Sequence, residues 1–389
     1  MKVLMIAPTP FFADRGCHVR IMAEVRALQL RGHEVVVSTY ALGQDVPGIH
    51  TVRTVSVPWY RKLSAGPSWH KYYIDCLLLG LTNYWIRRWR PDVLHAHLHE
   101  GAFVGALARG RRHIPLILDY QGSLVDETTA HRFTRPGTFH YGCLNRVERW
   151  VERRVDAIIC NTLANVDRLK QLHTELDGRL YLLADSVDTH LFRPDVDGGQ
   201  VRQRLGLPRD IPLIVYAGLL SDHQGVGLLL EALARLREGR RFHALLIGYP
   251  NEEHYKGVAL GLGLEGDVTF AGRLGFQELP SHLAAADLAV SAKLPSSEGN
   301  GKLCVYLATG LPVVAFDTPV NREIAGNDAI LVSPVTADAL SQGMEKVLDS
   351  PLLQRSIRER ARRRAVTHLS DEAVGDALCN IYANVRRAA

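Results

Sequence analysis

The sequence predicts an α/β protein with two doubly wound domains, each a parallel sheet covered by helices on both faces. Short apolar segments and amphipathic segments alternate through both halves of the chain, which is the pattern of repeated βαβ units. At 389 residues the chain is too long for one ordinary core and suits two domains of similar size. We expect domains at residues 1–190 and 191–389, with a linker around residues 187–195.

The first half begins with a buried strand, KVLMIA at residues 2–7. Helices are expected near residues 17–31, 69–89 and 101–109. The remaining strands of this half read HEVVVSTY, VRTVSV, DVLHAH, IPLILDY, RVDAIIC and RLYLLAD.

The second half restarts with PLIVYAG at residues 212–218, followed by a helix from Gly225 to Glu238. The strands that follow read FHALLIG, DVTFAG, DLAVSA, PVVAF and AILVS, with helical patterns between them. A last helix is expected at about residues 371–387.

Composition indicates an ordinary soluble protein, with 47% hydrophobic and 22% charged residues. No apolar run approaches the roughly 20 residues that span a bilayer, and the apolar part of the N-terminus is too short for a signal peptide. The six cysteines form no CxxC pair, which argues against a zinc ribbon or a disulfide framework and favours a reducing, cytoplasmic setting.

The net charge of +5 is concentrated in the first half of the chain. Residues 1–195 contain 25 Lys and Arg against 19 Asp and Glu, whereas the rest contains 21 against 22. No nucleic-acid module is recognisable, so no nucleic-acid partner is expected, and a preference for phosphates or a membrane surface fits better.

Four of the five tryptophans fall within residues 59–89, interleaved with basic residues. One interpretation is a peripheral contact with the inner membrane face through residues 59–90. The other is a helix that packs its Trp side on the domain, and we favour this second one.

Residues 295–317 carry the clearest functional pattern. An irregular Ser/Gly/Asn-rich segment with one carboxylate, Glu298, runs into a helical pattern from Lys302 to Thr309, which Gly310 is placed to stop. Backbone N–H groups at such a helix start bind anionic oxygens. Glu298 can accept hydrogen bonds from hydroxyls, as in many sugar sites.

The order of these parts resembles the donor-sugar site of glycosyltransferase family 4. The usual text there is close to EGFG, a helix ending in Glu-Ala-hydrophobic-Ala-x-Gly, and then PVVA; here EGNG, a short helix and PVVA follow one another. The resemblance covers nearly the whole chain and implies the GT-B fold, with two Rossmann-like domains facing a central cleft. It implies an acceptor-binding first domain, a donor-binding second domain, and a last helix that crosses back to the first domain.

The implied activity is retaining, metal-independent transfer of a hexose-like sugar from a nucleotide-diphosphate sugar to an acceptor hydroxyl, giving an α-glycoside. The nucleotide sugar is a co-substrate and no other cofactor or metal is expected; the acceptor is a small molecule, a glycan or a lipid-linked sugar. Three alternatives keep the fold: a hydrolysing nucleotide-sugar epimerase, a pseudo-glycosyltransferase, and a non-catalytic sugar-binding homologue.

In the first domain, the segment HAHLHEG at residues 95–101 could be read as a metal motif because alternating histidines share one strand face. The resemblance favours instead that His97 and Glu100 contact hydroxyls in the cleft, with His95 and His99 serving packing or solvent contacts. Gln121 stands where many family members have a histidine that contacts the donor sugar. Asp119 and Glu127 are the carboxylates available beside it.

The resemblance therefore points to Glu298, His97 and Gln121 as the reactive set. It assigns the donor contacts to Gly16, Gly218, Arg273, Gly299, Asn300, Gly301, Lys302 and Leu303.

Three donor positions depart from the family pattern. Leu219 and Gln224 replace the Arg and Lys that usually bind the diphosphate, and Val305 stands where a Glu usually binds the ribose. We expect Lys302 or Arg273 to supply the missing charge.

Overall fold

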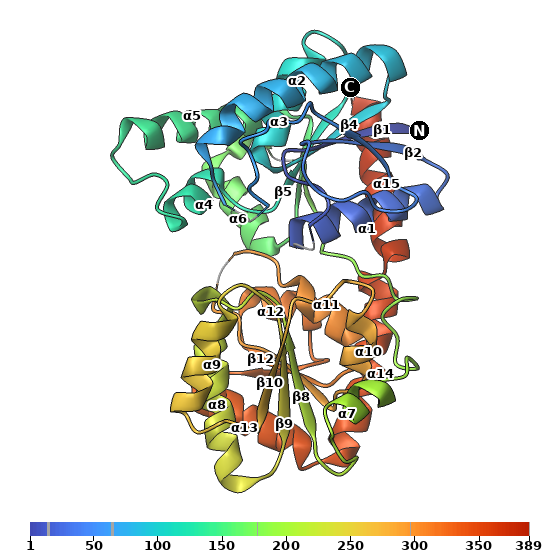
Figure 1. The fold of residues 1–389 in the computed structure, drawn as a ribbon. Coiled ribbons are helices and arrows are strands. Elements are labelled where there is room, and N and C mark those ends of the chain that lie inside the picture. Colours follow the sequence, from blue (N-terminus) through green and yellow to red (C-terminus); the bar gives the residue numbers. More distant parts are fainter. Residues whose placement is uncertain (14–15, 64–65, 177, 296, 389) are drawn as a thin grey trace. The chain divides into compact units, whose positions relative to one another are not determined.

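The computed structural model describes all residues except 14–15, 64–65, 177, 296 and 389 (Figure 1). The chain divides into two compact units. Unit 1 comprises Met1–Ala184, Ser297–Gly299 and Asp371–Ala389, and unit 2 comprises Asp185–Ser296 and Asn300–Ser370. The last helix therefore belongs to the same unit as the first strand.

Unit 1 contains a parallel sheet with the strand order β3-β2-β1-β4-β5-β6-β7. Its strands are β1 (Lys2–Ala7), β2 (Glu34–Thr39), β3 (His50–Arg53), β4 (Val93–His97), β5 (Leu116–Tyr120), β6 (Ala157–Cys160) and β7 (Leu180–Leu182). Its helices are α1 (Gly16–Leu30), α2 (Trp69–Trp89), α3 (Leu98–Arg109), α4 (Leu124–Ala130), α5 (Phe139–Arg154), α6 (Leu163–Leu172) and α15 (Asp371–Ala388).

Unit 2 repeats this plan with the order β10-β9-β8-β11-β12-β13, again parallel throughout. Its strands are β8 (Leu213–Ala217), β9 (His243–Ile247), β10 (Val268–Gly272), β11 (Leu288–Ser291), β12 (Val313–Phe316) and β13 (Ile330–Val332). Its helices are α7 (Gly199–Arg204), α8 (Val226–Gly239), α9 (Glu252–Gly261), α10 (Leu279–Ala284), α11 (Gly301–Ala308), α12 (Pro319–Ala325), α13 (Ala337–Leu348) and α14 (Pro351–Arg364).

Both sheets are buried on two faces, which explains why their strands are continuous apolar runs. All five residues of β8, LIVYA, are buried, and so are five of the six residues of β1. The predicted fold class, two doubly wound Rossmann-like domains, is thereby confirmed.

Local signals set the helix ends. The predicted helix at 69–89 coincides with α2, whose N-cap Ser68 accepts a hydrogen bond from the His70 N–H. Gly310 adopts the left-handed conformation (φ +71°) directly after α11, as the stop signal predicts. Helix α3 begins at Leu98, earlier than the predicted residue 101, because it starts directly at the end of β4 with His97 as its N-cap.

The four tryptophans of residues 59–89 divide into two pairs. Trp85 and Trp89, at the end of α2, are partly buried and pack against the core of unit 1. Trp59 and Trp69 are exposed instead. The interpretation favoured from the sequence is that the tryptophans pack on the domain. It therefore holds for Trp85 and Trp89 but not for Trp59 and Trp69.

Within the described residues, no helix combines the length and the apolar character that crossing a membrane requires.

Candidate functional site

The strand order of unit 2 reverses between β8 and β11. In doubly wound sheets, ligands bind outside the carboxyl ends of the strands at such a switch point. Gly218 directly follows β8, and Lys293 lies two residues beyond β11. These residues therefore mark the place where unit 2 is expected to bind a ligand.

Two glycines let the backbone close tightly at this edge. A Cβ atom on Gly218 would lie 3.1 Å from the Lys302 Nζ and 3.2 Å from the Tyr216 hydroxyl. Gly225 has φ +68°, and a Cβ there would lie 2.0 Å from the Ala292 carbonyl oxygen. Only glycine fits at position 225, and the absence of a side chain at 218 brings the Lys302 ammonium against the backbone.

Lys302 is the central charged group of this site. Its ammonium donates hydrogen bonds to the Gln224 side-chain oxygen and, at 3.4 Å, to the Tyr216 hydroxyl. The same ammonium lies 4.7 Å from the centre of the Tyr216 ring, within the range of a cation–π contact. Gln224, which stands where the family usually has a lysine, thus contacts a lysine that comes from α11.

A second cation lies close to the first. Burial and the positive charge of Lys293 lower the pKa of Lys302 to about 7. The Lys293 residue is itself buried, with only 7% of its surface exposed. An anion bound beside these two ammonium groups would offset both the burial and the mutual repulsion, so the arrangement suits a negatively charged ligand.

The loop that leads into α11 is anchored by Asn300. Its side-chain amide donates to the Ser291 hydroxyl at 3.0 Å and to the Asn321 side-chain oxygen at 2.8 Å. Asn300 is buried, and so is the Leu303 side chain in the core of unit 2. The Leu303 N–H donates to the Asn300 carbonyl oxygen. Asn300 and Leu303 therefore hold the loop in place. Gly301 and Lys302 are the first two residues of α11 and are the ones placed to contact a ligand.

The other predicted cation of unit 2 lies elsewhere on the sheet. Arg273 follows β10, which is separated from β8 by β9. Its guanidinium carbon lies 5.0 Å from the centre of the Tyr249 ring. Of the two expected cations, Lys302 rather than Arg273 is the one beside Gly218 and Gln224.

The segment Ser297–Gly299 packs with unit 1. The Ser297 carbonyl oxygen accepts a hydrogen bond of 2.8 Å from the Thr162 hydroxyl. Glu298 is exposed. Burial raises the pKa of Glu127, and the negative charges of Glu100 and Glu298 raise it further. Glu298 therefore acts electrostatically on carboxylates of unit 1.

The switch point of unit 1 lies between β1 and β4, and Gly16 opens α1 in the connection after β1. Gly16 is exposed, and a Cβ atom there would meet no other part of the described structure within 4 Å. The preceding loop is held by His18, whose ring accepts from the Ala13 N–H at 2.8 Å and lies 2.6 Å from the Thr9 hydroxyl. The backbone at Gly16 is therefore open to a ligand.

Asp119 is the hub of a buried network in unit 1. The Arg20 guanidinium donates to both of its carboxylate oxygens at 2.8 to 3.0 Å. His97, which the β4–β5 register pairs with Asp119, approaches Oδ2 with Nδ1 at 2.9 Å, and Gln121 donates to the same oxygen at 2.8 Å. Burial opposes the charged form, but Arg20 and His97 hold the pKa of Asp119 well below its usual range.

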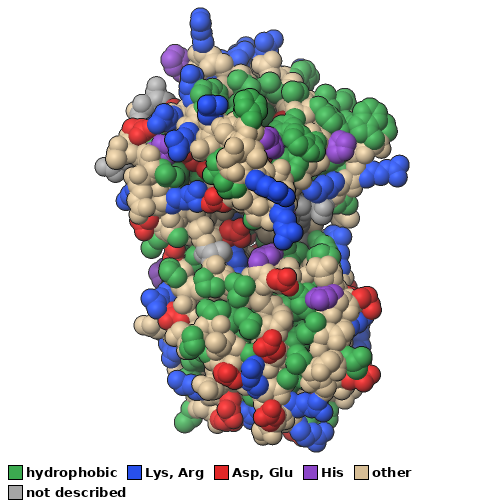
Figure 2. Space-filling model, turned by 90° about the vertical axis from the view of Figure 1, so that its left-hand side faces the viewer, with side chains coloured by type: hydrophobic (Ala, Val, Ile, Leu, Met, Phe, Trp, Pro, Cys, Tyr) green, Lys and Arg blue, Asp and Glu red, His purple; other side chains and the backbone are tan. Residues whose placement is uncertain are grey.

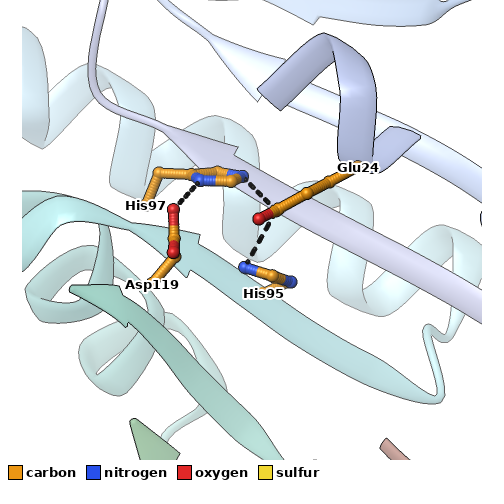
Figure 3. A group of neighbouring side chains, drawn as sticks. All are labelled: Glu24, His95, His97 and Asp119. Atoms are coloured by element: carbon orange, nitrogen blue, oxygen red, sulfur yellow. Dashed lines mark hydrogen bonds and ion pairs between the residues drawn. The ribbon is translucent and has the colours of Figure 1, made fainter. Parts of the chain in front are cut away.

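His95 and His97 lie on one face of β4, with ring centres 4.8 Å apart, as the alternating pattern predicts. Figure 3 shows both rings directed toward Glu24 of α1, at 3.5 Å for His95 and 3.9 Å for His97. The other His95 nitrogen lies 2.5 Å from the Tyr382 hydroxyl of α15. Burial and the charges of His97 and Arg20 lower the pKa of His95, so this ring is neutral.

Among the residues that the structure describes, two groups of side chains have ligand atoms close enough to hold a metal ion: Glu24, His95, His97 and Asp119, and separately His99, Glu148 and Glu152. In the first group Arg20 already neutralises Asp119 and pairs with Glu24 at 3.1 Å, so a metal would compete with it. In the second, His99 and His173 contact the two Glu152 oxygens at 3.3 and 2.7 Å. The three histidines of HAHLHEG thus divide between two networks.

Glu100 accepts a hydrogen bond of 2.5 Å from Lys71 of α2. The sequence patterns did not single out Lys71, Lys293, Arg20 or Glu24. Lys293 could have been found from its position, because it directly follows the predicted strand DLAVSA, at the carboxyl end where ligands bind.

Two family models match the chain, one in each half. The model described as "Glycosyl transferase 4-like domain" matches residues 15–177, and the one described as "Glycosyl transferases group 1" matches residues 199–364. The alpha-D-kanosaminyltransferase of Streptomyces kanamyceticus is 28% identical over 312 residues, which cover 75% of this chain and 77% of the relative.

A D-inositol 3-phosphate glycosyltransferase of Thermomonospora curvata is 26% identical over 402 residues, covering 95% of this chain and 91% of the relative. Among solved structures, that of the Anabaena protein HepE in complex with UDP and glucose superposes with a TM-score of 0.79 at 18% identity, covering 99% of this chain and all of the other. This last likeness concerns the fold alone.

Proposed function

Because the chain belongs to the glycosyltransferases of the family 4 type, with the GT-B fold, we propose that it is a retaining enzyme. It moves a hexose from a nucleoside-diphosphate sugar to an acceptor hydroxyl and gives an α-glycoside. The observation that carries the proposal is the pair of neighbouring lysines at the switch point of unit 2, the buried Lys293 and the partly buried Lys302.

The leaving group of such a reaction is a nucleoside diphosphate, and its charge grows as the bond to the sugar breaks. Preorganised cations in a site with little water stabilise such a charge most strongly. Lys302 and Lys293 supply two of them, together with the N–H groups at the start of α11. In our proposal these groups take the place of the missing Arg and Lys at Leu219 and Gln224, and no metal ion is required.

The bond changes balance without a further reagent. The bond between the anomeric carbon and the diphosphate oxygen breaks, and its electron pair stays on the oxygen. The acceptor oxygen forms the new bond on the same face of the sugar, and its proton passes to the departing diphosphate. The α-configuration named for the kanosaminyltransferase relative and the UDP and glucose bound by HepE support this scheme.

In unit 1, Gln121 is the proposed contact for a sugar hydroxyl. Its amide nitrogen is committed to Asp119, which leaves the side-chain oxygen to accept a hydrogen bond. His97 and Arg20 act through Asp119 as positioning residues, since both are buried against that carboxylate. Glu298 is the second proposed hydroxyl contact. The acceptor is a polyol or a sugar, as the name of the inositol-phosphate relative suggests.

We place the enzyme in the cytoplasm, where its six free cysteines stay reduced. The test is a panel of UDP-, GDP-, ADP- and dTDP-sugars, each with and without polyol and sugar acceptors. We expect nucleoside diphosphate release that depends on the acceptor, with an α-linkage in the product by NMR. Turnover without an acceptor would indicate an epimerase, a β-linkage would refute retention, and binding without turnover would indicate a sugar-binding protein.

A further inference from the structure

Large aromatic side chains are exposed at the start of α2, in the connection before it, and at the first residue of α5. Trp59 is 70% exposed, Trp69 is 63% exposed and Phe139 is 84% exposed, and Tyr72 and Tyr73 are exposed beside them. We call these five residues the aromatic patch. Soluble proteins seldom leave so many large rings in water unless the surface binds something.

Aromatic neighbours hold Trp59 and Trp69 in place. The Trp69 ring lies 4.8 Å from that of Phe133 and 5.0 Å from that of His140, with which it stacks. The Trp59 indole N–H donates to the Tyr73 hydroxyl at 3.0 Å. These contacts join the start of α2 to the connection before it, to the connection between α4 and α5, and to the start of α5, so Trp59 and Trp69 are not isolated side chains.

Basic residues outnumber acidic ones in the segments that carry the patch. Residues 51–74 and 128–147 contain seven Lys and Arg. Two of these are paired with carboxylates from outside the segments, Arg53 with Asp45 and Lys71 with Glu100. Arg61, Arg132 and Arg135 are exposed, and none of them forms an ion pair with a carboxylate among the residues that the structure describes. Figure 2 shows hydrophobic and basic side chains side by side on the face of unit 1 that it presents.

We propose that the aromatic patch docks unit 1 on a lipid bilayer that contains anionic lipids. Trp and Tyr rings favour the headgroup region, because they present an apolar body and a polar tip. Basic residues beside them gain about 1 kcal/mol each from an anionic surface. This proposal rests on surface chemistry and is independent of the donor site.

A second copy of the chain is the poorer occupant. A two-fold contact through the patch would bring the exposed arginines of one copy close to those of the other, and the resulting repulsion would disfavour it. Anionic headgroups provide a charge opposite to that of these arginines.

The experiment measures binding of the full chain to vesicles of phosphatidylcholine with and without 30% phosphatidylglycerol (about one lipid in three, enough to set a negative surface potential). Trp59→Ser with Trp69→Ser and Phe139→Ser removes the apolar contacts, and Arg61→Gln with Arg132→Gln and Arg135→Gln removes the charges. The matched control is Leu352→Ser with Arg355→Gln on α14, where Leu352 is 82% exposed and Arg355 is exposed.

We expect the wild type and the control to bind the anionic vesicles, less tightly as salt rises, with a blue shift of tryptophan emission. Each patch variant should bind at least tenfold more weakly while keeping its circular dichroism and its affinity for nucleoside diphosphates. Failure of the wild type to bind, or an equal loss in the control, would overturn the proposal. A dimer in sedimentation velocity that the patch variants abolish would assign the surface to a second copy instead.

Discussion

The ammonium of Lys302 donates a hydrogen bond to the side-chain oxygen of Gln224. Family 4 sequences usually carry a lysine where this chain has Gln224, and the lysine that contacts this position here comes from the start of α11. The amide accepts from the new lysine, and the glycine at position 218 leaves room for its ammonium.

The first prediction concerns the charge of Lys302. Lys302→Met should weaken binding of a nucleoside diphosphate by roughly 10- to 100-fold, since a charge-assisted hydrogen bond contributes about 1.5–3 kcal/mol. Binding of the free nucleoside should change little. Calorimetric titration measures both, with the exposed Lys346→Met on α13 as the matched control. Equal diphosphate affinity in mutant and wild type would show that another group binds the phosphates.

The second prediction concerns pH. Because the pKa of Lys302 is about 7 in the free protein, a bound diphosphate should raise it and draw in a proton. Diphosphate affinity should therefore fall as pH rises through 7, and titrations in buffers of different ionisation enthalpy should report proton uptake near neutral pH.

The stability of the ligand-free protein should change with pH in the opposite direction to the diphosphate affinity. The unfolded chain has the higher lysine pKa, so it binds more protons between about pH 7 and pH 10, and the stability of the ligand-free protein should rise with pH there. Lys302→Met should flatten both profiles; unchanged profiles in this variant would refute the assignment to Lys302.

The third prediction concerns Asp119. Asp119→Asn removes the carboxylate that accepts three hydrogen bonds from the buried Arg20 guanidinium, which should cost about 3–5 kcal/mol in urea unfolding. Asp126→Asn, which removes the exposed partner of Arg168, should cost less than about 1 kcal/mol. Because the pKa of Asp119 is lowered in the folded protein, its contribution to the free energy of unfolding is present above about pH 4 and is lost as the pH falls further. A small effect of Asp119→Asn at pH 7 would contradict the described network.

The fourth prediction concerns Glu298. Glu298→Ala should lower turnover at least tenfold and leave the melting temperature within about 2 °C, because the residue is exposed. Glu265→Ala, another exposed carboxylate, should change neither. Wild-type kinetics in the Glu298 variant would remove this residue from the site.

The fifth prediction compares two neighbouring glycines. Gly225→Ala should destabilise the protein by more than about 1 kcal/mol and weaken diphosphate binding, because the new Cβ would meet the Ala292 carbonyl at 2.0 Å, next to Lys293. Gly227→Ala lies inside α8 with open space around it and should stabilise by roughly 0.5–1 kcal/mol. Similar unfolding curves for the two variants would refute the close approach.

Most of the fold could be predicted from the sequence because its signals are local. The apolar run of β8, the cap at Ser68 and the stop at Gly310 act within a few residues of the chain. The helix and the strand that follow the proposed donor loop, α11 and β12, could be predicted for the same reason, since a glycine-rich segment, a short helix and a strand follow one another directly.

The charge networks could not be predicted in this way. The contact of Arg20 with Asp119 joins residues 99 positions apart. Lys293 comes close to Lys302 only because β11 lies beside β8 in the folded sheet, and the sequence does not show that neighbourhood. The role of Leu303 illustrates the reverse difficulty. It adjoins Gly301 and Lys302, the proposed anion contacts, in sequence, but the helical turn points its side chain into the core.

The membership of α15 in unit 1 has a consequence for how the protein is made. The hydroxyl that His95 meets belongs to Tyr382, so this histidine acquires its partner only after all of unit 2 has been synthesised. At the usual 5–20 residues per second, the interval between Ala184 and Asp371 takes roughly 10–40 seconds on the ribosome. During that time the side of α1 that packs against α15 is uncovered in the nascent first unit. Chaperone demand should therefore be set by the order of translation, and a circular permutant that begins with α15 should need less assistance to fold.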